Sequence, residues 1–231
     1  MATKQKRTNN RGSGLELRDD IVPLTKNQKK LFESTKNAVA SGCAGTGKTF
    51  GATWLGLRDI MYRGEYSKLT YIRSIVPTRD IGFLKGDDKE KVQAYEDPYI
   101  DIAQKLFGRG DGYEVAKHRG LIEFLPTSFL RGSTLDDRVI IVDECQNMSY
   151  HELDTIITRV GLNCRIFFCG DEKFQSDLKG NGVRAFWRVL EEMRDDFDFV
   201  EFDTDDIVRS DLVKRYLLAR YAVHGDKQLS N

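Results

Sequence analysis

Short apolar runs alternate with longer amphipathic segments along this chain. The runs are rich in β-branched and aromatic residues, a composition that is typical of strands buried in a sheet. They cover residues 69–76, 121–124, 139–142, 165–169 and 197–202, and the shorter run Ala38-Val39-Ala40 precedes them. The pattern predicts a β-strand at each of these places.

The segments between most of these runs carry apolar residues at helical spacing. They predict helices over residues 27–35, 49–62, 97–107, 150–160, 183–193 and 207–221, and in the first of these Leu31 and Phe32 are expected to face inward. Strands that alternate with helices build an α/β fold with a mainly parallel sheet flanked by helices. In such sheets, ligands bind at the carboxyl ends of the strands.

Three segments lack this periodicity. Residues 1–20 are mostly basic and polar, which predicts a flexible arm, and residues 223–231 predict a flexible tail. Residues 77–91 are charged and contain glycine, which predicts a long surface loop. We therefore expect one globular domain over residues 21–222.

Composition narrows the class of protein. A chain of 231 residues with 40% apolar residues can bury one good core. The formal net charge of zero does not mark a nucleic-acid binder, so any such surface must be a local patch. The four cysteines form no CxxC pair, and no long apolar run suggests a signal peptide or a membrane span. We expect a reduced, cytoplasmic protein with no membrane partner.

A glycine-rich stretch follows the first predicted strand and matches the phosphate-loop pattern G-x-x-x-x-G-K-[ST]. In this pattern the backbone N–H groups surround phosphate oxygens, the lysine reaches the β- and γ-phosphates, and the hydroxyl ligates Mg²⁺. An ordinary glycine turn is the alternative, but it leaves Lys48 and Thr49 unexplained. The predicted ATP-binding residues are Gly42, Cys43, Ala44, Gly45, Thr46, Gly47, Lys48 and Thr49.

Two adjacent carboxylates end the apolar run at 139–142, as in a Walker B motif. Asp143 would hold Mg²⁺ together with Thr49, and Glu144 would polarise the attacking water. Acids after a strand are often only a solvated turn. Their pairing with the phosphate loop favours the catalytic interpretation.

Two glutamines are further candidates. Gln175 follows another apolar run and could sense the γ-phosphate, although a plain strand-to-loop turn also fits. Gln28 lies upstream of the phosphate loop and could pair its amide with both the donor and the acceptor on the adenine edge. On spacing alone, a solvated glutamine on a helix fits equally well.

The ordered set of motifs resembles the PhoH family of ATPases, whose core is related to superfamily 1 helicases. The resemblance covers residues 25–220. It rests on NQKK at 27–30, GCAGTGKT at 42–49, GFLKGD at 82–87, FLRGSTLDDRVIIVDECQN at 129–147, TRVG at 158–161, CGDEKFQSDL at 169–178 and DDIVRSDLV at 205–213. Two departures occur: one additional residue stands between Gly170-Asp171 and Gln175, and Cys145 replaces the usual alanine.

The resemblance implies a RecA-like core that hydrolyses ATP with Mg²⁺ and acts on RNA or single-stranded DNA. It implies that Gln28 reads adenine and that Arg209 is an arginine finger. Arg73 and Arg131 are implied as contacts to nucleic acid or to another subunit. The additional residue before Gln175 puts its sensor role in doubt.

Alternatives to this function remain open at this point. A thymidine-type nucleoside kinase also joins a phosphate loop to a D-E-x-Q run, but it usually carries a paired-cysteine zinc site. A nucleotide-switched nucleic-acid-binding module would bind ATP with little turnover, which Glu144 argues against.

The length of the chain bears on assembly. Since the chain can build only one RecA-like lobe, a neighbouring subunit would have to supply the second wall of the nucleotide site. We therefore expect a homo-oligomeric ring, a hexamer by the resemblance, in which Arg209 reaches the γ-phosphate of the next subunit. A plain salt bridge at a helix end is the alternative role for Arg209.

Overall fold

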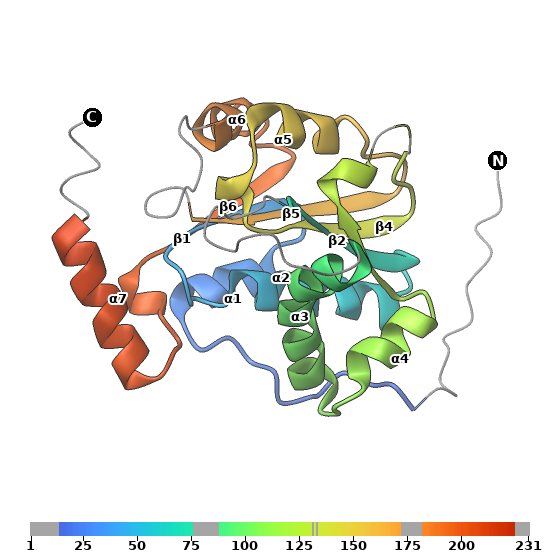
Figure 1. The fold of residues 1–231 in the computed structure, drawn as a ribbon, viewed down its shortest axis with the longest axis horizontal. Helices are drawn as coiled ribbons and strands as arrows, with labels where there is room; N and C mark the ends of the chain where they lie inside the picture. The colour runs from blue at the N-terminus through green and yellow to red at the C-terminus, as the bar shows by residue number, and fades with distance from the viewer. Residues whose placement is uncertain (1–13, 76–87, 131, 133, 172–181, 225–231) are drawn as a thin grey trace.

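A parallel six-stranded sheet forms the centre of the molecule (Figure 1). The computed structural model describes residues 14–75, 88–130, 132, 134–171 and 182–224. The strand order is β3-β2-β4-β5-β1-β6, and all neighbouring pairs are parallel. The strands are β1 (Asn37–Gly42), β2 (Lys68–Arg73), β3 (Ile122–Pro126), β4 (Arg138–Val142), β5 (Cys164–Gly170) and β6 (Phe197–Phe202). The predicted α/β fold with a parallel sheet is confirmed.

Helices cover both faces of this sheet (Figure 1). One face carries α1 (Lys26–Glu33), α2 (Lys48–Met61), α3 (Asp88–Phe107) and α4 (Gly112–His118), and the other carries α5 (Tyr150–Ile157) and α6 (Gly182–Glu191). The last helix, α7 (Asp211–His224), lies beside the sheet rather than on either face. Short 3₁₀ turns occupy Thr127–Phe129, Cys145–Asn147 and Thr204–Asp206. None of the helices in these described segments is long and apolar enough to cross a membrane.

Strand β4 shows how the apolar runs build two cores. Successive side chains of a strand point to opposite faces of the sheet. Val139 and Ile141 accordingly belong to the core under α1–α4, whereas Ile140 and Val142 belong to the core under α5 and α6. Because both faces are covered, the strand is apolar throughout instead of alternating with polar residues.

Three helices show the main differences from the prediction. Helix α3 begins at Asp88, so residues 88–91, which were expected in a loop, are helical. Their charged sequence has no apolar period, but Lys89, Glu90 and Lys91 are good helix formers. Helix α4 was not predicted because it is short, although it buries Tyr113 and Ala116. Helix α7 begins at Asp211 rather than at residue 207.

The described part of the expected N-terminal arm packs on the domain. Leu15 and Leu17 are buried in the core under α1–α4. The backbone N–H of Leu17 donates to the Tyr62 hydroxyl at 3.1 Å, and that of Arg18 donates to the Leu106 carbonyl at 2.8 Å. Residues 14–20 therefore differ from the predicted flexible arm, since two leucines supply the apolar contact that a solvated arm lacks. Residues 1–13 and 225–231 lie outside the described residues.

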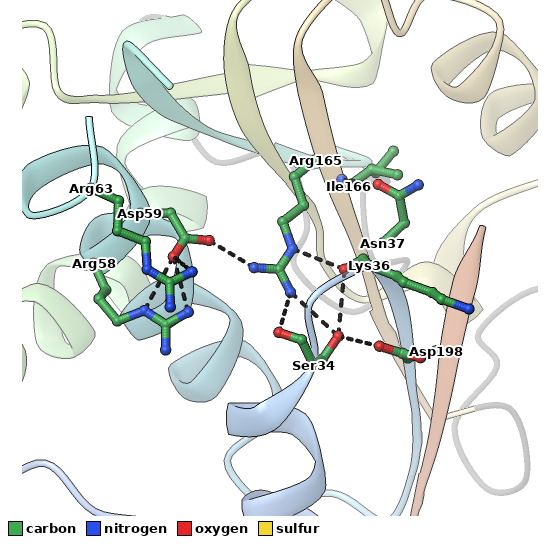
Figure 2. Close-up of polar contacts among 9 residues, drawn as sticks. All are labelled: Ser34, Lys36, Asn37, Arg58, Asp59, Arg63, Arg165, Ile166 and Asp198. Carbon is green, nitrogen blue, oxygen red and sulfur yellow. Dashed lines mark hydrogen bonds and ion pairs between the residues drawn. The ribbon is translucent and has the colours of Figure 1, made fainter. Parts of the chain in front are cut away.

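A buried ion pair joins three elements at the amino ends of β1 and β5 (Figure 2). The Arg165 guanidinium donates to Asp59 on α2 at 2.7 Å and to the carbonyls of Ser34 and Lys36 at 2.8 and 2.9 Å. Asp59 is fully buried, and Arg165 is 4% exposed. The pair therefore links α2 and β5 to the segment that leads into β1.

We expect that Asp59→Ala lowers the free energy of unfolding by about 3 to 5 kcal/mol, because it leaves the buried Arg165 charge without its carboxylate. Urea denaturation measures this change. The control is Lys29→Ala, which removes the exposed pair with Glu33 and should cost less than about 0.5 kcal/mol. Similar losses in the two variants would contradict the importance of the buried pair. The double variant Asp59→Leu with Arg165→Met should be more stable than Asp59→Leu alone. The apolar pair leaves no single charge buried.

Candidate active site

The phosphate-loop sequence forms the turn between β1 and α2. Gly42 has φ +112°, and a Cβ on it would lie 1.9 Å from the Phe202 carbonyl oxygen, so only glycine fits there. Gly45 and Gly47 also have positive φ values, +75° and +84°, which L residues rarely adopt. The turn ends directly at the amino terminus of α2. A helix amino terminus carries the free N–H groups and the positive dipole that favour an anion.

Lys48 lies across this loop. Its Nζ donates to the carbonyls of Gly42 and Cys43 at 2.8 and 2.7 Å. Burial lowers the pKa of Lys48, while nearby carboxylates, Asp171 first among them, act in the opposite direction. The two carbonyls therefore hold the Lys48 ammonium group against the phosphate loop.

Thr49 and Asp143 bring the two predicted halves of the site together. The Thr49 Oγ1 donates to Asp143 Oδ1 at 2.7 Å, although the two residues belong to different elements. A hydroxyl and a carboxylate are hard oxygen ligands, and Mg²⁺ usually takes one or two carboxylates together with phosphates and waters. The Thr49 hydroxyl and the Asp143 carboxylate therefore fit as Mg²⁺ ligands, and they would hold the ion beside the phosphates.

Glu144 follows in an unusual backbone conformation. Its φ of 54° lies in the left-handed region, which is uncommon for residues other than glycine and is found at functional sites. The Gln146 side-chain amide donates to the Glu144 carboxylate at 2.5 Å and accepts from the Asp171 N–H at 2.9 Å. Burial and the neighbouring Asp143 raise the pKa of Glu144, which makes its carboxylate a stronger base toward water.

Gln28 contacts the phosphate loop from α1. Its Nε2 donates to the Thr46 carbonyl at 2.9 Å, and its Oε1 accepts from the Leu24 N–H at 2.7 Å. The side chain is 7% exposed, so Gln28 is not a solvated surface residue. An amide has two N–H donors and an oxygen with two lone pairs, so each end retains capacity for a further hydrogen bond.

The segment after β6 also returns to the phosphate loop of the same chain. The Val208 N–H donates to the Gly45 carbonyl at 3.1 Å, and a Cβ on Gly45 would lie 2.8 Å from Arg209 Cγ. No ion pair involves Arg209 within the described segments. Arg209 therefore lies against its own loop, whereas the sequence suggested a reach into the next subunit.

Helix α7 contacts the loop through Tyr221. The Tyr221 hydroxyl accepts from the Ala44 N–H at 3.0 Å, and its ring packs with Cys43, Ile207 and Leu217. Burial raises the pKa of Tyr221 to about 12, so the hydroxyl remains protonated at neutral pH. A phosphate oxygen bound in the loop would compete with this hydroxyl for the Ala44 N–H.

Arg73 lies next to the acidic pair at the end of β2. Its guanidinium is 5.6 Å from the centroid of the Tyr95 ring. Burial acts to lower the pKa of Arg73, but Tyr99, Asp143 and Glu144 outweigh it and raise the pKa. The cation is therefore half-buried and close enough to the acidic pair to interact with it, in contrast to a fully exposed contact on the surface. Arg131 and Gln175 lie outside the described residues.

Sequence reasoning did not find three side chains that contact the site: Gln146 as a partner of Glu144, Tyr221 on the phosphate loop, and Tyr99, whose hydroxyl donates to Asp143 at 3.1 Å. Gln146 belonged to the D-E-x-Q run and to the motif at 129–147, but neither gave it a role at Glu144. The two tyrosines lie in predicted helices, where an inward aromatic residue is typical of a core. No local signal separates them from ordinary core residues.

Comparison with known proteins agrees with the motifs. A family model described as PhoH-like protein matches residues 20–221. The chain belongs to the PhoH family. The PhoH-like protein of Bacillus subtilis (strain 168) is 36% identical over 182 residues, which are 77% of this chain and 56% of that protein. Protein PhoH of Escherichia coli (strain K12) is 29% identical over 217 residues, 90% of this chain and 61% of that protein. This PhoH family member thus spans little more than half the length of these curated relatives.

Solved structures support the fold. The large terminase from a thermophilic bacteriophage matches with a TM-score of 0.53 and 14% identity, over 84% of this chain and 50% of that chain. The same terminase in complex with ADP matches with a TM-score of 0.50 and 12% identity, over 84% and 49%. The predicted RecA-like P-loop fold of this PhoH family member is confirmed.

Proposed function

We propose that the chain is a Mg²⁺-dependent ATPase that couples hydrolysis to the binding or remodelling of RNA or single-stranded DNA. The observation that carries the proposal is the 2.7 Å hydrogen bond between Thr49 Oγ1 and Asp143 Oδ1. It supports the proposal because it joins Thr49 and Asp143, the two proposed metal ligands, and Glu144 is the next residue along the chain. Mg²⁺ held there would neutralise charge on the β- and γ-phosphates.

The other residues have distinct roles in this proposal. Lys48 binds the β- and γ-phosphates, and the loop N–H groups bind the remaining phosphate oxygens. Gln28 uses its remaining donor and acceptor for the adenine edge while it contacts the loop through Thr46. Glu144 accepts a proton from the attacking water, and Gln146 orients the Glu144 carboxylate by donating to it. Gln175 stays the predicted γ-phosphate sensor.

Phosphate release from ATP tests the proposal. We expect turnover that requires Mg²⁺ and increases with RNA or single-stranded DNA. Phosphate transfer to thymidine without free phosphate would favour the nucleoside kinase, and tight ATP binding without turnover would favour the switched binding module. Either result would replace the ATPase proposal.

Binding to single strands should depend steeply on salt and little on sequence, because phosphate contacts dominate such binding. We propose Arg131 and the basic residues before Gly14 as the main contacts, with Arg73 less suited because it is half-buried and interacts with the acidic pair. Each phosphate contact contributes a slope of about −0.7 in a plot of log K against log salt for single strands. Arg131→Ala should reduce the steepness by about that amount, measured by fluorescence anisotropy. Affinity independent of salt would contradict these contacts.

We propose that the active form is a ring, a hexamer by the family resemblance. The described sheet forms one RecA-like lobe, and in the proposed ring a neighbouring subunit would supply the second wall of the nucleotide site. Helix α7 supports this proposal because it exposes several large apolar side chains beside the phosphate loop: Leu212, Val213, Tyr216, Leu218 and Val223. Exposed apolar patches often mark interaction sites. Native mass spectrometry with and without ATP measures the number of subunits, and a monomer under both conditions would contradict the ring.

A further inference from the structure

The Asp143 carboxylate is held from two sides. Its Oδ1 accepts from Thr49 on α2 at 2.7 Å, and its Oδ2 accepts from the Tyr99 hydroxyl on α3 at 3.1 Å. Asp143 is 6% exposed and Tyr99 is fully buried. Each oxygen of the proposed metal ligand therefore has a donor from a different helix.

The Tyr99 ring is clamped in the core. It stacks on Tyr71 of β2 with ring centroids 4.0 Å apart and an angle of 14°, and it contacts Phe124 of β3 at 5.7 Å. Neighbours on both sides leave the side chain little freedom to change rotamer. The position of the ring thus defines where the hydroxyl points.

Packing alone does not account for this hydroxyl. Phenylalanine would fill nearly the same space in the stack, and a buried hydroxyl costs free energy unless it forms a hydrogen bond. Groups that hydrogen-bond to metal ligands orient them, and their loss typically costs about 10-fold to 100-fold in metal affinity. The Tyr99 hydroxyl is placed as such a group, because it donates to the Asp143 carboxylate.

We propose that Tyr99 is a positioning residue for Mg²⁺: its hydroxyl fixes the Asp143 carboxylate beside Thr49. The proposal rests on the proposed function, since it assumes that Asp143 is the metal ligand. Through this contact, helix α3 would influence how tightly the site holds Mg²⁺ with a nucleotide. Without the hydroxyl, the Asp143 carboxylate can rotate out of the orientation in which its Oδ1 accepts from Thr49.

Tyr99→Phe tests the proposal, and Tyr71→Phe is its matched control. Both variants remove one buried hydroxyl from the same aromatic stack, but the Tyr71 hydroxyl contacts Thr53 at 3.0 Å instead of Asp143. ADP binding is measured by calorimetry in EDTA and over a series of Mg²⁺ concentrations, and the rate of ATP hydrolysis is measured over the same series. Melting temperatures without metal show that each variant folds.

For Tyr99→Phe we expect the half-saturating Mg²⁺ concentration to rise about 10-fold to 100-fold in both assays. ADP affinity in EDTA should stay unchanged, and high Mg²⁺ should recover the lost hydrolysis. Tyr71→Phe should leave the Mg²⁺ dependence as in the wild type. An unchanged Mg²⁺ dependence in folded Tyr99→Phe, or an equal shift in Tyr71→Phe, would overturn the proposal.

The binding assay separates this proposal from the proposed function. If the wild type binds Mg²⁺ with ADP but does not hydrolyse ATP, the proposed function fails, while the shift in ADP binding still supports the role of Tyr99. If Mg²⁺ changes neither the ADP affinity nor the rate of ATP hydrolysis of the wild type, both proposals fail.

Discussion

Glu144→Gln is expected to lower the rate of ATP hydrolysis by about 10² to 10⁴-fold while ATP and Mg²⁺ stay bound. The amide has nearly the shape of the carboxylate, but it cannot accept a proton from the attacking water. The phosphate loop and the Thr49–Asp143 pair do not depend on this charge, so binding should be retained. Single-turnover hydrolysis and equilibrium binding of ATP measure the two effects separately.

Lys48→Ala provides the contrast to Glu144→Gln. Lys48 would bind the phosphates directly, so its loss should weaken ATP binding as well as abolish turnover. A Glu144→Gln variant that hydrolyses ATP at the wild-type rate would remove Glu144 from the mechanism. Loss of ATP binding in that variant would instead assign Glu144 a role in binding.

Arg209→Ala is expected to lower ATP turnover by about 10³ to 10⁵-fold, the usual contribution of an arginine finger, with ATP still bound. Arg209 lies against Gly45 of its own phosphate loop, and the prediction assumes that its guanidinium contacts the phosphates of a bound ATP. Arg209→Lys retains the charge but not the planar group, so it should recover little activity. An Arg209→Ala variant with near wild-type turnover would leave only a structural role.

Mixed assemblies show on which subunit Arg209 acts. Lys48→Ala and Arg209→Ala subunits are combined after each has been shown to be inactive. Because the structure places Arg209 on its own loop, we expect no recovery of ATPase activity, since every subunit lacks one of the two groups. Recovery would show that Arg209 acts across an interface between subunits. Exchange of labelled subunits confirms that mixing occurred.

The fold and half of the site were predictable because they depend on local patterns. The apolar run before Asp143 is buried on both faces of the sheet, and the glycines of the phosphate loop adopt the positive φ values that their sequence pattern requires. The pairing of Thr49 with Asp143 followed from two motifs that must meet at the carboxyl edge of a parallel sheet. The early start of helix α3 was not predicted, because its first residues are charged and have no apolar period that would indicate a helix.

By itself, the sequence determined the parallel α/β fold, the phosphate loop and the acidic pair, since local spacing and backbone chemistry specify them. Only the tertiary structure decided that Tyr99 contacts Asp143, that Arg209 lies on its own phosphate loop, and that Arg73 lies over the Tyr95 ring. Tyr99 and Asp143 are 44 residues apart, and Tyr221 and Ala44 are 177 apart. Such contacts depend on the strand order and on helix placement, and these are set by the packing of the whole core rather than by any local pattern.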